Sequence, residues 1–318
     1  MNNEPGGQQL VIEHLTKRYG DHTVVDDLTF TVEPGRVTGF LGPNGSGKST
    51  TMKILLDLAA ADHGSATIGG SRYRDLREPA GTVGVMIEPN AFHPGRSGRN
   101  HLRIVAEASG HPMTRVDEAL AAVDLGSEPA RRRVGTYSLG MKQRLSLAAA
   151  LLGDPGVLVL DEPANGLDPQ GIHDLRDLLR SRAARGHTVL VSSHLLTEVQ
   201  HLVDDVVVIN NGQLVTTGTI DDLTGHRALV RTPEPAVLAN HLARAGVDIE
   251  PSGTDSLVIA GLSLDQIGDA AHAAGIALHE LSADAGSLED VFLSLTTNHS
   301  TTNTSTTNTS TEQEAYAS

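Results

Sequence analysis

A glycine-rich stretch between an apolar segment and a helical segment constrains this chain more than any other feature. Residues 42–50 read Gly-Pro-Asn-Gly-Ser-Gly-Lys-Ser-Thr and fit the phosphate-loop pattern G-x-x-x-x-G-K-[ST]. The preceding residues 36–41 suit a buried strand, and residues 51–56 suit a helix. Glycines let backbone N–H groups turn toward a phosphate, and the helix N-terminus adds positive potential. The stretch therefore predicts a nucleoside-triphosphate site formed by Gly42, Pro43, Asn44, Gly45, Ser46, Gly47, Lys48, Ser49 and Thr50.

Two side chains of this loop have separate predicted roles. Lys48 is placed to reach the β- and γ-phosphates, and Ser49 offers its hydroxyl to a Mg²⁺ ion. The loop thus predicts a metal-assisted triphosphate site rather than a simple glycine-rich turn.

The composition limits the class of partner. The formal net charge is −15, which disfavours nucleic acid or an anionic lipid surface as the main partner. Aromatic residues make up 3% of the 318 residues, too few for a base-stacking platform. The absence of cysteine excludes disulfides and suits the cytoplasm. No apolar run approaches 18 residues, so we expect no direct membrane span.

A second motif places two carboxylates after an apolar run. Residues 156–163 read Gly-Val-Leu-Val-Leu-Asp-Glu-Pro, which predicts a buried strand ending at Asp161 and Glu162. Ligands of parallel sheets gather at this end of the strands, and burying unpaired carboxylates is costly. We expect Asp161 to hold Mg²⁺ and Glu162, on the other side of the pleat, to polarise a water molecule. Residues 188–193 predict a neighbouring strand that brings His194 to the γ-phosphate, with a purely structural histidine as the alternative.

Three further positions each admit two interpretations. Tyr19, between two predicted strands, either stacks on a purine or is a surface turn residue. Glu88 follows the apolar residues 82–87 and either contacts Mg²⁺ and water or ends a turn. Ser138 is placed to cap a helix and, with Gly140, either serves only that structural role or binds an anion.

Together these motifs make residues 8–223 similar to the ATP-binding subunits of ABC transporters. The matching positions, in chain order, are Tyr19 in the aromatic loop, residues 42–50 as Walker A, Ser138 and Gly140 in the signature, residues 158–162 as Walker B, Asp168 in the D-loop and His194 as the switch histidine. The resemblance implies an α/β P-loop NTPase domain of the ABC type, with a mixed sheet and a helical subdomain.

The same resemblance implies the roles of the site residues. ATP and Mg²⁺ are the expected cofactors, with Ser49, Glu88 and Asp161 around the metal. Glu162 would be the base that activates water for ATP hydrolysis. His194 would sense or stabilise the γ-phosphate, and Lys48 would neutralise charge in the transition state. Each ATP would lie between the phosphate loop of one subunit and the signature of the other, which implies a homodimer in the ATP-bound state. In that dimer, Ser138, Gly140 and Asp168 of one subunit would contact the ATP bound to the other.

Two departures from the usual pattern narrow the resemblance to one branch. Glu88 stands where the family usually has glutamine, and residues 137–141 read Tyr-Ser-Leu-Gly-Met instead of Leu-Ser-Gly-Gly-Gln. Both resemble the bacitracin- and daunorubicin-resistance ATPases. This implies a drug, antibiotic or peptide exporter subunit on the cytoplasmic side of the cell membrane, bound to an integral-membrane permease through a groove near residues 88–98. The permease would select the cargo, so the sequence of this chain does not identify the transported substrate.

Two other classes of function are less consistent with the sequence. A soluble ABC ATPase acting on ribosomes would generally carry two ATPase halves, and one acting on DNA would carry a long coiled coil. This chain has one phosphate loop and no such heptad run. A nucleotide-binding module without hydrolysis is disfavoured because Glu162 is present.

The sequence predicts three segments, namely an ATP-binding domain at residues 1–223, an accessory α+β domain at 224–297 and a disordered tail at 298–318. The second segment shows a strand-helix-strand pattern twice, as in ferredoxin-like units. The expected strands are 227–232, 247–250, 256–260 and 276–281, and the expected helices are 236–245, 264–274 and 287–295. In the first segment, Thr114 and Asp117 suggest a capping box at the start of a helix.

Overall fold

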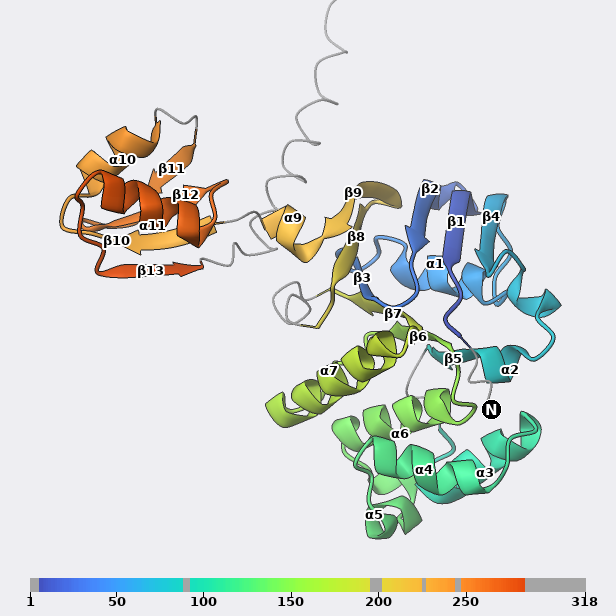
Figure 1. Ribbon diagram of the computed structural model, residues 1–318. Coiled ribbons are helices and arrows are strands. Elements are labelled where there is room, and N and C mark those ends of the chain that lie inside the picture. Colours follow the sequence, from blue (N-terminus) through green and yellow to red (C-terminus); the bar gives the residue numbers. More distant parts are fainter. Residues whose placement is uncertain (1–5, 88–91, 195–201, 225–226, 244–246, 284–318) are drawn as a thin grey trace, which may run out of the picture.

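The computed structural model describes residues 6–87, 92–194, 202–224, 227–243 and 247–283. Glu88, the predicted helix at 287–295 and the predicted tail at 298–318 lie outside the described residues. Within those ranges the strands form a six-stranded, a three-stranded and a four-stranded sheet (Figure 1).

The six-stranded sheet is the centre of the ATP-binding region. Its order is β5-β6-β7-β3-β8-β9, and all neighbours are parallel except β8 and β9. Its strands are β3 (Val37–Leu41), β5 (Val83–Met86), β6 (Val157–Asp161), β7 (Thr188–Ser193), β8 (Asp205–Asn210) and β9 (Gln213–Thr219). Every residue of β3, β6 and β7 is buried, as expected for parallel strands covered on both faces.

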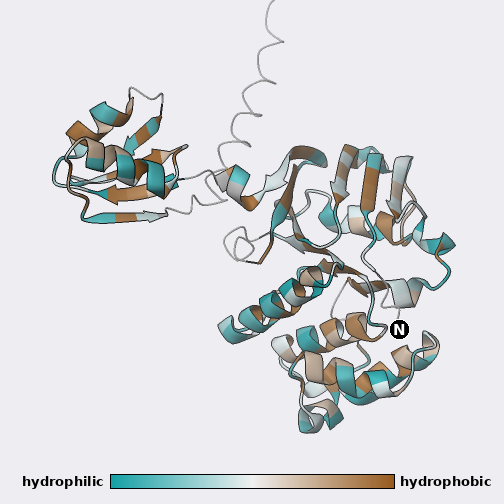
Figure 2. Ribbon diagram, viewed as in Figure 1, coloured by the Kyte–Doolittle hydropathy of each residue, from teal (hydrophilic) through white to brown (hydrophobic). Residues whose placement is uncertain are grey.

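Alternating side chains of β6 enter two different cores. Val157 and Val159 pack with the three-stranded sheet and α1, whereas Leu158 and Leu160 pack with the helices on the opposite face. The three-stranded sheet, in the order β2-β1-β4, consists of β1 (Leu10–Tyr19), β2 (His22–Val32) and β4 (His63–Ile68), and α1 spans Lys48–Leu55. Hydrophobic residues accordingly occur along the central strands and on the helices that cover them (Figure 2).

Seven further helices of the ATP-binding region accompany its two sheets in the described residues. They are α2 (Pro79–Thr82), α3 (Gly98–Ala108), α4 (Thr114–Ala122), α5 (Ser127–Arg131), α6 (Leu139–Leu151), α7 (Pro169–Ala184) and α9 (Ile220–Thr224), with short 3₁₀ turns at Tyr73–Asp75 and Val134–Thr136. The predicted capping box is wrong, because Met113 is the N-cap residue and no side chain caps α4. Asp117 forms an ion pair with Arg99 of α3 instead, which joins the two helices.

Residues 227–283 build a separate hydrophobic core around the four-stranded sheet. Its elements are β10 (Arg227–Arg231), α10 (Pro235–Ala243), β11 (Asp248–Pro251), β12 (Ser256–Ala260), α11 (Leu264–Ala273) and β13 (Glu280–Ala283). The strand order β11-β12-β10-β13 with antiparallel pairs is the ferredoxin-like arrangement that the sequence predicted. The last strand begins later than predicted, because the Ile276 N–H bonds to the Ala271 carbonyl at the end of α11 and is not free to pair in the sheet.

None of the described helices is both long and apolar enough to cross a membrane.

A buried ion pair joins α7 to the loop after α6. Arg182, which is buried, donates from Nη1 to Asp154 Oδ1 at 2.5 Å, and Arg115 of α4 lies 3.4 Å from the other carboxylate oxygen. Partial burial acts to raise the pKa of Asp154, but Arg182 and Arg115 outweigh it, so that pKa lies below its usual value. The pair therefore stabilises the fold only while Asp154 is ionised.

We expect Arg182→Met to lower the free energy of unfolding by roughly 2 kcal/mol at neutral pH, less than for a fully buried pair. Asp154 loses a partner that keeps its pKa low, but burial lowers the pKa of the Arg182 guanidinium, so removing that cation also removes a desolvation cost. Asp154 has a lower pKa in the folded than in the unfolded chain, so its contribution is present above the unfolded pKa. That contribution disappears as pH falls through the folded pKa. Urea unfolding at pH 7 and at pH values below about 4 tests this. The exposed Arg131→Met, on α5, is the control, and an equal loss in both variants would contradict the assignment.

Candidate nucleotide-binding site

The phosphate loop connects β3 to α1 and is shaped by its glycines. Gly45 and Gly47 have φ values of +82° and +105°, in the left-handed region that glycine tolerates best. A Cβ atom at Gly47 would lie 2.7 Å from the carbonyl oxygen of Val24 on β2. Glycine is therefore required there both by the backbone conformation and by the close approach of the β1–β2 hairpin.

Lys48, the first residue of α1, is buried against its own loop. Its Nζ donates hydrogen bonds to the carbonyl oxygens of Gly42 at 2.6 Å and Pro43 at 3.1 Å. Burial lowers the pKa of the Lys48 ammonium, and the negative charges of Glu162 and Asp161 offset part of that effect. Because the ammonium is held by two neutral carbonyls at the rim of the loop, it is positioned to contact an anion bound there.

The loop borders a cavity of about 210 Å³ that is suited to phosphates. The cavity is lined by Val24, Asn44, Gly45, Gly47, Lys48, Ser49, Thr50 and Glu162. The neighbouring Ser46 is 2% exposed, and its buried Oγ has no hydrogen-bond partner within the described part of the chain. A lysine ammonium and a helix N-terminus at the border of this cavity fit a polyphosphate, since each gains an anionic partner.

The two carboxylates after β6 differ in backbone conformation. Asp161 is the last residue of the strand and is buried, and one of its oxygens accepts a hydrogen bond from Ser192 Oγ. Glu162 has a φ of +50°, a conformation that costs a non-glycine residue roughly 1–3 kcal/mol. The pleat argument was therefore wrong, because Glu162 lies beyond the strand and the left-handed turn sets its direction.

His194 lies beside Glu162, as the predicted strand order required. Its Nδ1 is 2.9 Å from Glu162 Oε2, and β7, which precedes His194, pairs directly with β6. A carboxylate and an imidazole at hydrogen-bond distance form a pair that can orient and deprotonate a water molecule. Because Glu162 also lines the phosphate cavity, this pair faces the place where a γ-phosphate would lie.

The signature and D-loop residues lie apart from the cavity, at the beginnings of two helices. Ser138 caps α6 by accepting a hydrogen bond from the Met141 N–H at 3.2 Å, and Asp168 caps α7 by accepting one from the Gly171 N–H at 3.0 Å. Ser138 and Asp168 are exposed, and Gly140 is partly exposed. In this subunit these residues are not brought to the phosphate loop.

Leu139 brings the signature and the D-loop into contact. It occupies the position where the family usually has glycine, and a Cβ atom at Gly166 would lie 2.4 Å from Leu139 Cδ2. Gly166 also has a φ of +77°. The leucine therefore packs on a turn that only glycine can form.

We expect Gly166→Ala to reduce ATP hydrolysis at least roughly tenfold, because the new methyl group must displace either Leu139 or the turn. The double variant Leu139→Gly/Gly166→Ala removes the overlap and leaves only the left-handed strain, so its activity is expected to recover in part. Phosphate release by the two variants tests this contact. A double variant no more active than Gly166→Ala would show that the contact with Leu139 is not the cause.

The structure places Tyr19 at the end of β1, with 54% of its surface exposed and Lys17 Nζ 5.2 Å from the ring centre. This exposed ring is available for stacking, but it does not line the phosphate cavity. Its role in binding a purine stays a prediction, as does the role of Glu88, which lies outside the described residues.

Sequence reasoning missed two side chains that hold Glu162. The Glu162 N–H donates to Ser192 Oγ at 2.9 Å, and the Glu162 carbonyl accepts from Gln143 Nε2 at 2.7 Å. Ser192 lies on β7, two residues before His194, so its place beside the catalytic residues could have been inferred from the sequence. Gln143 lies on α6, and nothing in its local sequence indicates its partner.

Comparison with protein families gives two matches. A model described as ABC transporter matches residues 25–165, and a model described as a domain of unknown function matches residues 226–289. Among curated proteins, the uncharacterized ABC transporter ATP-binding protein YhcH of Bacillus subtilis is 33% identical over 293 residues, 90% of this chain and 95% of the relative. The bacitracin transport ATP-binding protein BcrA of Bacillus licheniformis is 42% identical over 212 residues, 66% of this chain and 69% of the relative.

Solved structures agree with these relatives. The structure of an ATP-binding subunit of an ABC transporter has a TM-score of 0.62 and 27% identity, and it covers 82% of this chain and 98% of the solved chain. These comparisons confirm the fold class predicted from the sequence. The chain belongs to the family of ABC transporter ATP-binding proteins and is an ATPase of that family.

Proposed function

We propose that this chain is the energy-coupling subunit of an exporter, with Glu162 as the general base of ATP hydrolysis. The observation that carries the proposal is the Glu162–His194 contact of 2.9 Å at the edge of the phosphate cavity. Glu162 would accept a proton from the attacking water, and His194 would orient Glu162 and contact the γ-phosphate. Lys48 would neutralise charge that develops on the transferred phosphoryl group.

We further propose that Ser49, Asp161 and Glu88 hold the Mg²⁺ ion that accompanies ATP. Ser49 lines the cavity and Asp161 lies near Lys48, and hydroxyl and carboxylate oxygens are ligands that Mg²⁺ prefers. When bound, the metal supplies charge neutralisation to the β- and γ-phosphate oxygens. Ser192 would keep the Asp161 carboxylate oriented toward that position.

The remaining nucleotide-contacting residues suggest that two copies of the chain form an ATP-bound homodimer. Ser138, Gly140 and Asp168 lie away from the phosphate cavity of their own subunit, on surfaces that solvent reaches. They would contact the ATP bound to the partner's phosphate loop, while Tyr19 would stack on the purine of its own ATP. Solved relatives of the same fold include a dimeric ABC transporter cassette.

The named relatives suggest the kind of cargo and the location. Two of them are bacitracin transport ATP-binding proteins, and another is a lantibiotic transport ATP-binding protein. We therefore propose export of a drug, antibiotic or peptide by a separate integral-membrane permease, with this chain peripheral on the cytoplasmic side of the cell membrane. ATP-driven closure of the dimer would be transmitted to that permease.

We also propose that residues 1–223 form the ATP-binding domain, that residues 224–297 form an accessory domain and that residues 298–318 form a disordered tail. The separate core of residues 227–283 supports the first boundary. For this accessory domain we propose a regulatory or dimer-supporting role.

Affinity capture from native membranes tests the proposal. Tagged Glu162→Gln protein is incubated with detergent-solubilised membranes, ATP and Mg²⁺, and the bound proteins are identified. A stoichiometric multi-span membrane protein is the expected result. The double variant Lys48→Ala/Glu162→Gln, which is expected to bind ATP at least about 30-fold more weakly, is the matched control. Recovery of ribosomal or DNA-repair proteins without a membrane protein would overturn the exporter assignment.

A further inference from the structure

The peptide of Glu162 is held from two sides by residues distant in sequence. Its N–H donates to Ser192 Oγ on β7, and its carbonyl oxygen accepts a hydrogen bond from Gln143 Nε2 on α6. Between these contacts the residue keeps its left-handed φ of +50°. Because a left-handed glutamate is strained, the surrounding contacts must maintain the conformation that directs its carboxylate to His194.

Gln143 is suited to this task by its burial and its chemistry. It is 3% exposed and lies in the second turn of α6, five residues after the cap residue Ser138. A carbonyl can accept only from the amide nitrogen, so the contact fixes the orientation of the glutamine amide. Burial of an amide is costly unless it is hydrogen-bonded, and the Glu162 carbonyl supplies that partner.

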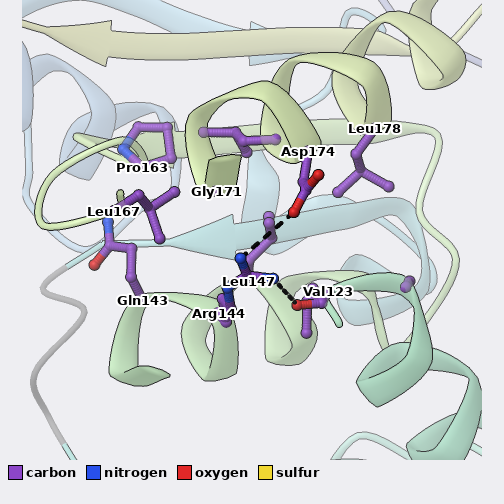
Figure 3. Close-up of a pocket in the computed structure, with 11 residues that line it drawn as sticks. Val123, Gln143, Arg144, Leu147, Pro163, Leu167, Gly171, Asp174 and Leu178 are labelled. Atoms are coloured by element: carbon purple, nitrogen blue, oxygen red, sulfur yellow. Dashed lines mark hydrogen bonds and ion pairs between the residues drawn. The ribbon is translucent and has the colours of Figure 1, made fainter. Parts of the chain in front are cut away.

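The next residue of α6 has a different task. Figure 3 shows Gln143 beside Leu167 and Pro163, which belong to the segment after β6, whereas Arg144 is turned toward Val123 and Asp174. Arg144 donates to the Val123 carbonyl at 2.9 Å and joins α6 to neighbouring helices. Gln143 is therefore the residue of this pair that contacts the Glu162 peptide.

We propose that Gln143 is a positioning residue that links the signature helix to the catalytic base of the same subunit. The inference rests on the proposed role of Glu162. Ser138, at the start of α6, would contact the ATP held by the partner subunit, and Gln143 holds the peptide of the base that serves the subunit's own ATP. A displacement of α6 is transmitted to Glu162 through this hydrogen bond.

Two substitutions of Gln143 test the proposal in the full chain. Gln143→Met keeps the length but removes the donor, and Gln143→Glu keeps the shape but replaces the donor with an acceptor. We expect kcat to fall roughly 10- to 100-fold because the base is misplaced, with the KM for ATP changed less than about twofold. Leu147→Ala, on the same helix, is the control. It is expected to lower Tm by loss of packing while kcat stays at the wild-type value.

A double-variant cycle separates positioning from a general structural role. In the Glu162→Gln background, Gln143→Met is expected to cause no further loss of the residual rate, because the carboxylate that it positions is already gone. An equal loss in both backgrounds, or wild-type kcat in Gln143→Met, would overturn the proposal. If Gln143→Met does not fold, Gln143→Glu enters the same cycle.

The cycle also distinguishes this inference from the proposed function. Hydrolysis at the wild-type rate by Glu162→Gln alone would refute the role of Glu162 as the base. An inactive Glu162→Gln together with fully active Gln143 variants would refute only the positioning role of Gln143.

Discussion

The Glu162→Gln protein is expected to bind ATP normally, to hydrolyse it roughly 10²- to 10⁴-fold more slowly and to accumulate as an ATP-bound dimer. Glutamine has the shape of glutamate but cannot accept the proton of the attacking water. Lys48 and the phosphate loop are unchanged, so the nucleotide remains bound. The step that opens the dimer is blocked, and the closed state persists.

Two measurements on the same sample check this expectation. Phosphate release gives the rate, and light scattering with ATP and Mg²⁺ gives the mass. Glu128→Gln, which changes an exposed carboxylate at the start of α5, is the control and should hydrolyse ATP like the wild type. A Glu162→Gln protein that stays monomeric in ATP would count against the dimer mechanism.

Lys48→Ala is expected to weaken ATP binding by at least about 30-fold, the lower limit for removing one member of a buried charge pair. The Lys48 ammonium belongs to a residue that lines the phosphate cavity, and it is held in place by the Gly42 and Pro43 carbonyls. Without the ammonium, the potential in the cavity becomes more negative and repels the phosphates. Its remaining sources are the two carbonyls and the carboxylates of Asp161 and Glu162.

The nucleotide-free Lys48→Ala protein is expected to keep nearly wild-type stability. The lost hydrogen bonds are offset because a buried ammonium, whose burial lowers its pKa, no longer has to be desolvated. Titration with a fluorescent ATP analogue and thermal unfolding check the two expectations. Lys53→Ala, in the last turn of the same helix, is the control. Retention of wild-type ATP affinity by Lys48→Ala would refute the phosphate-binding role.

Features set by local sequence were predicted well. The central strands are continuous apolar runs because both faces of a parallel sheet are buried, and β7 was predicted at residues 188–193, where the structure has it. The ferredoxin-like arrangement followed from alternating strand and helix patterns. Errors occurred where a tertiary contact overrode a local signal, as when Arg99 paired with Asp117 and the expected capping box did not form.

The sequence by itself determined the phosphate loop, because its backbone needs positive φ angles that glycine adopts freely, and it determined which strands end in carboxylates and histidine. Only the tertiary structure decided the direction in which the Glu162 side chain points. Its direction comes from a left-handed turn held by Ser192 and Gln143, which are 30 and 19 residues away along the chain. Hydrogen bonds between residues so far apart depend on how β6, β7 and α6 pack, and no local pattern encodes that packing.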